Sequence, residues 1–228
     1  MRTVATCFSN AKMCTMWWTA RNKANAGERL WSTSEICSSV NYHLMEYDKL
    51  KNPTKEKHGE ANVKWKPPPA DSYKPNVDAS LLSSGKGGWG YIARDHDGTY
   101  LDAGNIPRAL SVLHAEAIAA VQGLERAAAL EMARVVVETD AANLGRALIS
   151  EDMDQCPEGG LFRTIRSVML TSFVSCTVSV CSRVCNKVAD CFAARGVSTL
   201  PVGECAFWCL APCFVTELVS CDMAGASS

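Results

Sequence analysis

The hydrophobic and polar positions between residues 74 and 106 alternate in the way that is typical of β-strands. In KPNVDASLL, the polar residues Asn76, Asp78 and Ser80 alternate with Val77 and Ala79, so the three polar side chains share one face of a predicted strand. WGYIARD and TYLDAGNI predict two further strands, and the Asp-Gly pair between them is a hairpin turn signal. This part of the chain therefore predicts three consecutive strands joined by short turns.

From residue 112 onward, helical spacing and continuous apolar runs replace the alternation. The Ala-rich segment 112–130 predicts a long helix, and ARVVVETD predicts a central strand that is buried on both faces. Helices over 141–149 and 160–170 and a strand in FVSCTVSV follow. In the last segment, Asn186 is predicted to cap the helix KVADCFAAR, which is expected to stop at Gly196.

The order of these elements predicts the fold class. Three adjacent strands are followed by helix, strand, helix, helix, strand and helix. Adjacent strands with short turns pair antiparallel, whereas strands separated by helices pair parallel through crossover connections. The chain is therefore predicted to be an α/β protein with a mixed sheet.

Four acidic residues stand beside or inside the apolar runs of four separate elements: Asp78, Glu116, Asp140 and Asp190. A charge in such a place is unfavourable unless it is paired or binds a metal ion, and a set of carboxylates suits hard cations such as Mg²⁺ or Mn²⁺. Three of these acids also have a simpler interpretation. Glu116 would be a helix N-terminal acid, Asp140 the N-cap of the next helix and Asp190 a solvated helix residue.

Six sequence pieces carry a resemblance to a known family. WKPPP, KPNVDAS, GGWGYIARDHDG, HAEAIAAVQGL, VVVETDAANL and NKVADCFAARG occur in this order between about Trp65 and Val197. Together they resemble the ribonuclease H-like domain of plant non-LTR retrotransposon polyproteins, the reverse-transcriptase-like RNase H type-1 family. The resemblance implies a five-stranded mixed sheet, three antiparallel strands followed by parallel ones, with helices on both faces. It also implies an N-terminal flank at 1–64, weakly ordered, a domain at 65–198 and a C-terminal extension at 199–228.

The resemblance also implies a function and a site. The acidic tetrad of the family falls on Asp78, Glu116, Asp140 and Asp190. These residues would hold two Mg²⁺ or Mn²⁺ ions and hydrolyse the RNA strand of an RNA–DNA hybrid. The expected partner is such a hybrid or another nucleic acid, and no small-molecule cofactor is expected. Contacts to the nucleic acid are expected from Asn76, Ser80, Arg183 and Asn186.

Departures from the family pattern leave a second function open. Ala79 stands where the family has Gly, Ala141 stands where it often has Ser, and Val180 and Cys181 occupy the region where it often has His. The alternative is therefore a catalytically weak or inactive ribonuclease H-like module that binds nucleic acid or a protein. A transposon remnant without a selected function is a third possibility.

The composition of the chain limits the expected partners, metals and cellular compartment. The chain has 228 residues and a formal net charge of −1, so no overall basic charge indicates nucleic acid. Seven lysines between Lys49 and Lys74 are either a solvated linker or an arm that contacts phosphates. The 12 cysteines include no CxxC pair, which argues against zinc, and the first residues lack the apolar region of a signal peptide. The protein is therefore expected to be intracellular, nuclear or cytoplasmic, with reduced thiols and no membrane partner.

Overall fold

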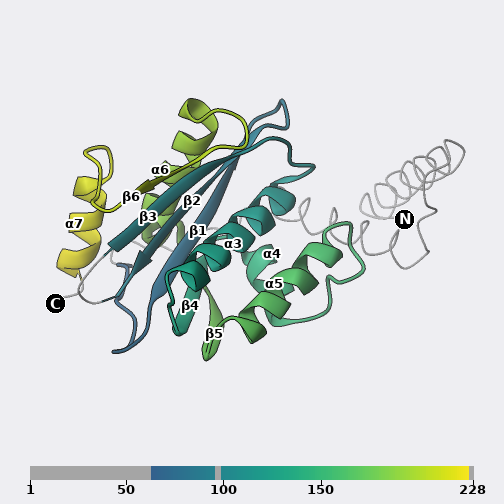
Figure 1. The fold of residues 1–228 in the computed structure, drawn as a ribbon, viewed down its shortest axis with the longest axis horizontal. Coiled ribbons are helices and arrows are strands. Elements are labelled where there is room, and N and C mark those ends of the chain that lie inside the picture. The colour runs from purple at the N-terminus through teal and green to yellow at the C-terminus, as the bar shows by residue number, and fades with distance from the viewer. Residues whose placement is uncertain (1–62, 96–98, 226–228) are drawn as a thin grey trace, which may run out of the picture. The chain divides into compact units, whose positions relative to one another are not determined.

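The computed structural model describes residues 63–95 and 99–225, and a six-stranded mixed sheet with helices is the main feature of residues 63–151 and 161–225 (Figure 1). The predicted flank at 1–64 lies almost wholly outside the described residues. The elements in chain order are β1 (Lys74–Leu81), β2 (Gly87–Arg94), β3 (Thr99–Ile106), α3 (Val112–Ala129), β4 (Arg134–Thr139), α4 (Ala142–Ile149), α5 (Gly159–Thr171), β5 (Ser175–Val180), α6 (Arg183–Thr199), β6 (Cys205–Trp208) and α7 (Thr216–Gly225).

The sheet has the strand order β5-β4-β1-β2-β3-β6. β1 and β2 pair antiparallel, as do β2 and β3, whereas β4 pairs parallel to both β1 and β5. The mixed pattern that was predicted from the order of elements is therefore confirmed. It places β1, which carries Asp78, beside β4, which ends one residue before Asp140.

The prediction of five strands was wrong, because the C-terminal extension supplies a sixth. β6 pairs antiparallel with β3 along Leu101–Gly104. Exposed and half-buried residues alternate along the Cys205–Trp208 segment, so one side of the strand packs inward and the other faces solvent. The pairing covers the edge of β3, whose backbone N–H and C=O groups would otherwise stay unpaired.

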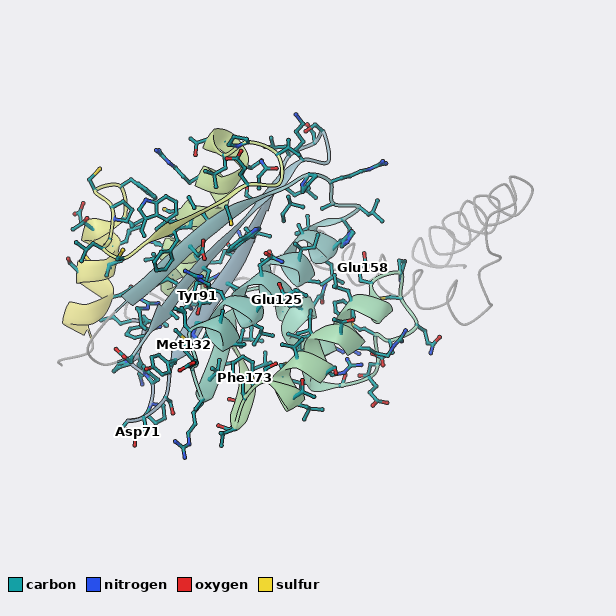
Figure 2. The ribbon with its side chains drawn as sticks, viewed as in Figure 1. Asp71, Tyr91, Glu125, Met132, Glu158 and Phe173 are labelled. Carbon is teal, nitrogen blue, oxygen red and sulfur yellow. The ribbon has the colours of Figure 1, made fainter. Side chains whose placement is uncertain are left out.

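Helices cover both faces of the sheet, as predicted (Figure 1). On one face α3 packs against β1 and β2, and the Gly123 position lies directly against the side chains of Val77 and Tyr91. The hydroxyl of Tyr91 donates a hydrogen bond to the sulfur of Met132 at 3.7 Å on this side of the sheet (Figure 2). On the other face α6 crosses β1, β2 and β3.

The last helix of the domain is longer than predicted. α6 begins at Arg183 after the N-cap Ser182 and continues past Gly196 to Thr199. Gly196 does not stop the helix. A side chain there would meet the backbone of Gly104, so glycine allows the helix to lie directly on β3. Asn186 lies inside the helix and caps nothing.

The C-terminal segment packs against α6 and the neighbouring strands. Phe192 of α6 is fully buried, and its ring lies 5.1 Å from the Trp208 ring and 5.3 Å from the Phe214 ring. Val215 completes this apolar cluster together with Ile92 of β2. β6 and α7 are therefore part of the packed molecule. None of the helices within 63–95 and 99–225 has the length and apolarity that crossing a bilayer needs.

Candidate active site

Four elements each position one of the predicted acidic residues. Asp78 lies in the middle of β1 and faces α6, because its cross-strand neighbour Gly90 lies directly beneath the backbone of that helix. Glu116 lies on α3, Asp140 directly follows β4, and Asp190 lies on α6. The parallel pairing of β1 with β4 and the crossing of α6 bring these elements together.

Asp78 is at the centre of the four acids. Its side chain is buried, and burial is the main reason why its pKa rises from 3.8 to about 8. The negative charges of Asp140 and Asp190 raise the pKa further, and a hydrogen bond to the Asp190 carboxyl acts in the same direction. A hydrogen bond from the Ala79 backbone opposes the rise. Asp78 therefore keeps its proton at neutral pH in the metal-free protein.

Glu116 is the second strongly perturbed acid. Burial raises its pKa from 4.5 to about 9, and the charges of Asp78 and Asp140 add to this. The Ala79 backbone and the Arg183 guanidinium act in the opposite direction. Oε2 of Glu116 is buried and has no hydrogen-bond partner among the described residues. The buried position is unlike that of a solvent-facing helix N-terminal acid, and it leaves one carboxyl oxygen available to a ligand.

Two side chains from the start of α6 hold Asp140. Nδ2 of Asn186 donates to Oδ1 of Asp140 at 2.9 Å and to the Val77 carbonyl at 3.1 Å. Nε of Arg183 lies 3.3 Å from Oδ2, although 90% of the Arg183 side chain is exposed. Asp140 does not cap α4, because the N-cap is Ala141, which makes no side-chain cap hydrogen bond. The helix-cap interpretation of Asp140 is therefore wrong.

Asp190 is exposed, unlike Asp78 and Glu116. It is nevertheless not an isolated surface residue, since its carboxyl is hydrogen-bonded to Asp78. The four acids therefore lie within electrostatic reach of one another, with Asp78 linking Asp190 to Asp140 and Glu116.

The acids are close but are not arranged as metal ligands. Over the stretches 63–95 and 99–225, no three or more His, Cys, Asp or Glu side chains are arranged to hold a metal ion. The raised pKa values of Asp78 and Glu116 indicate that other negative charges lie near them. This proximity does not require the carboxyls to have the geometry of metal ligands. Metal binding by Asp78, Glu116, Asp140 and Asp190 therefore stays a prediction.

The four residues predicted to contact nucleic acid fall into two groups. Asn76 and Asn186 are buried and bonded within the protein. Ser80 is half-buried, and Arg183 is largely exposed. A nucleic-acid contact by any of them stays untested, but the buried amides of Asn76 and Asn186 have clear partners in the fold itself.

Sequence reasoning missed a polar cluster behind the acids. Oε1 of Glu138 pairs with Nζ of Lys74 at 3.1 Å, and Oε2 accepts from Nδ2 of Asn76 at 3.1 Å. Arg94, fully buried at the end of β2, donates to Oδ1 of Asn76 at 2.7 Å. Glu138 directly after the Val run and Arg94 near the end of the apolar strand WGYIARD were the available signals. The partner Asp222 lies 128 positions away from Arg94, and no local pattern points to it.

Comparisons with known proteins agree on the type of domain. The family model described as Reverse transcriptase-like matches residues 76–196. No curated protein matches the chain. The solved structure of LC11-RNase H1, isolated from compost by a metagenomic approach, is 18% identical, with 56% of this chain and 96% of that chain covered and a TM-score of 0.50. This likeness shows the ribonuclease H fold.

Two further solved structures are similar at lower TM-scores. RNase H1 from the halophilic archaeon Halobacterium salinarum NRC-1 is 18% identical, with 57% of this chain and 99% of that chain covered and a TM-score of 0.46. LC11-RNase H1 in complex with an RNA/DNA hybrid is 18% identical, with 55% and 96% covered and a TM-score of 0.47.

Proposed function

The chain belongs to the Reverse transcriptase-like family, and from this premise we propose that it hydrolyses the RNA strand of RNA–DNA hybrids. One observation carries the proposal. Four elements bring four carboxyls within electrostatic reach, and two of them, Asp78 and Glu116, have pKa values raised to about 8 and about 9. Strongly perturbed acids that gather at one place are typical of sites that perform chemistry.

The chemistry of these carboxylates suits Mg²⁺ or Mn²⁺ ions, although their side chains are not grouped as ligands over the described residues. Carboxylate oxygens are the ligands that these ions prefer, and the buried, unpartnered Oε2 of Glu116 lacks a donor or cation that would satisfy it. Asp78, Glu116, Asp140 and Asp190 would hold the ions. When bound, such ions activate a water molecule and neutralise the charge that develops on the transferred phosphate.

The protein's own residues prepare this arrangement. Asn186 orients Asp140 through Oδ1, Arg183 pairs with the other oxygen, and the Ala79 backbone bonds to both Asp78 and Glu116. Burial of Asp78 and Glu116 limits the access of water to these two carboxyls. A divalent cation, if bound, would take the place of the proton that the raised pKa of Asp78 indicates.

We place nucleic acid at the exposed side of this cluster. Arg183 is an exposed cation that pairs with Asp140, and a guanidinium can donate two parallel hydrogen bonds to a phosphate. The resemblance further points to an intracellular protein of retrotransposon origin. LC11-RNase H1 was solved with an RNA/DNA hybrid, which is the substrate class proposed here for this chain.

Cleavage of a labelled RNA–DNA hybrid tests the proposal. The full chain is expected to release short RNA products with Mg²⁺ or Mn²⁺ and none after chelation. Asp78→Asn keeps the shape of the side chain but loses the charge, so it is expected to abolish cleavage. Glu125→Gln on the exposed side of α3 is the matched control and is expected to cleave like the parent. Cleavage by Asp78→Asn at the parent rate would place the activity elsewhere or in a contaminant.

A binding-only role is favoured by one observation. Val180 and Cys181 occupy the region where the family often carries His, and burial raises the pKa of the Cys181 thiol to about 12, so it exchanges no protons near neutral pH. Hybrid binding without cleavage under both Mg²⁺ and Mn²⁺ would establish this second role. The same labelled hybrid in a gel-shift measurement separates the two functions.

A further inference from the structure

We propose that the C-terminal helix α7 positions the acidic site through a buried chain of polar contacts that runs from Asp222 through Arg94 to Asn76. This inference rests on the proposed function, because it assigns positioning residues to that site. None of the three residues is expected to touch substrate or metal. Their role is to fix the strands and the helix that carry the acids.

Arg94 lies in the middle of this series of polar contacts. Its side chain is completely buried, and its guanidinium pairs with the Asp222 carboxylate and stacks on the Trp65 ring at 3.8 Å. A buried guanidinium is strongly unfavourable without such partners. Asp222 is the acid that Arg94 pairs with among the described residues, so α7 neutralises a charge in the interior of the sheet.

Asn76 connects Arg94 to β4 and to α6. Oδ1 of Asn76 accepts from Nη2 of Arg94 at 2.7 Å, which turns the amide nitrogen toward the opposite side. Nδ2 then donates to Oε2 of Glu138 at 3.1 Å and lies 3.5 Å from the carbonyl of Cys185. A single amide therefore ties β1 to β4 and to the first turn of α6, and Arg94 decides which way it faces.

Each segment that Asn76 joins carries a residue of the site. Asn76 and Asp78 stand two positions apart on the same face of β1, and Glu138 stands two positions before Asp140. Cys185 immediately precedes Asn186, which donates to Asp140. A rotation of the Asn76 amide would remove the bond between these segments directly behind the carboxyls.

The chain of contacts depends on residues outside the range that the family model matches. Residues 76–196 are matched, whereas Trp65 and Asp222 lie before and after this range. Lys74, also outside it, pairs with Glu138 and donates to the carbonyl of Lys66 at 2.8 Å. The two flanks therefore complete the support of the site from both sides.

Mn²⁺ binding by the full chain tests the inference. The parent, Asp222→Asn and the matched control Glu217→Gln, an exposed acid on the same helix, are titrated calorimetrically at a temperature at which circular dichroism shows each to be folded. Loss of the charge behind the site is expected to weaken Mn²⁺ binding by about tenfold, as outer-shell changes do at metal sites. The control is expected to bind like the parent, and Asp222→Glu, which keeps the carboxylate, is expected to recover most of the affinity.

The outcomes separate the two proposals. A lower melting temperature for Asp222→Asn with an unchanged dissociation constant would make α7 merely structural and overturn this inference alone. A parent that does not bind Mn²⁺ would overturn the proposed function as well. If Asp222→Asn does not fold, Arg94→Lys takes its place, because a lysine keeps the charge but lacks the planar fork whose two nitrogens reach Asp222 and Asn76 separately. An unchanged dissociation constant for that variant would overturn the inference equally.

Discussion

At the scale of single residues, ionisation is most unfavourable at two carboxyls of the site, those of Asp78 and Glu116. Asp78 and Glu116 are both buried, and each feels the negative charge of a neighbour. One pKa unit corresponds to about 1.4 kcal/mol, so rises of this size represent a substantial preference for the protonated forms. Arg183 offsets part of this charge, since it pairs with Asp140 and lowers the pKa of Glu116.

Arg183→Gln is expected to tighten Mn²⁺ binding while leaving stability almost unchanged. The guanidinium competes with a cation for Asp140, and its removal is expected to lower the dissociation constant by about two- to fivefold. The ion pair itself is exposed and contributes at most about 1 kcal/mol to folding. Titration calorimetry and thermal melting measure the two effects. Weaker binding would mean that Arg183 orients Asp140 and does not compete for it.

At the scale of elements, the site depends on how closely α6 approaches the sheet. The Gly90 position lies against the backbone of Ala189 and the Phe192 side chain, and any side chain there would push the helix outward. Asp78 lies opposite Gly90, and Asp190 follows Ala189. The same close approach that allows packing therefore also brings the two hydrogen-bonded carboxyls together.

Gly90→Ala is expected to destabilise the protein by about 2–4 kcal/mol, because the added methyl group overlaps the backbone of α6 in a region without free space. Chemical denaturation measures the loss. Ala194→Ser, on the exposed side of α6, is the control and is expected to stay within about 0.5 kcal/mol of the parent. A Gly90→Ala protein of parent stability would show that the helix can move away from β2 at little cost.

At the scale of the whole molecule, charges far apart in the sequence are balanced within one core. Asp222 of α7 pairs with Arg94 of β2, and Arg126 of α3 pairs with Asp102 of β3 at 3.1 Å. Burial also raises the pKa of Asp102 to about 6. The dependence of stability on pH and on cations is therefore determined by contacts between distant elements of the fold.

The stability of the metal-free protein is expected to fall as the pH rises from about 5 to about 9. Asp78 and Glu116 have native pKa values of about 8 and about 9 against 3.8 and 4.5 without the fold, so the native state binds more protons in this window. Their contribution is fully present below about pH 4 and is lost as the pH passes through the native values. The melting temperature is expected to fall by about 5 °C or more.

Asp78→Asn is the informative variant for this pH dependence. It removes one titrating group and one of the charges that raise the pKa of Glu116, so its melting temperature is expected to depend less on pH. Glu125→Gln is expected to keep the slope of the parent. A parent protein whose melting temperature is constant across the window would contradict the raised pKa values.

Divalent cations are expected to stabilise the parent more at the upper end of this pH window than at the lower end. A cation replaces the protons that Asp78 and Glu116 otherwise hold, and binding to the native state at about 100 times the dissociation constant adds about 2.7 kcal/mol. Thermal melting with Mn²⁺ measures the shift, and Asp78→Asn is expected to lose most of it. A melting temperature that is indifferent to Mn²⁺ and Mg²⁺ would count against a metal site.

The sequence by itself determined the order and type of the elements from β1 to α6 and singled out Asp78, Glu116, Asp140 and Asp190. These features follow from local information, because the period of apolar residues predicts strands and helices, and a charge in an apolar run is visible along the chain. The mixed pairing of strands followed in turn from the order of elements.

Only the tertiary structure decided which groups meet. Several features join segments that are distant in the sequence: the sixth strand, the contact of α6 with β3 at Gly196, the contact between Asp78 and Asp190, and the ion pair between Asp222 and Arg94. Such contacts depend on the packing of whole elements, which no local period encodes. The pKa values of Asp78 and Glu116 belong to the same class, because burial and neighbouring charge exist only once the chain has folded.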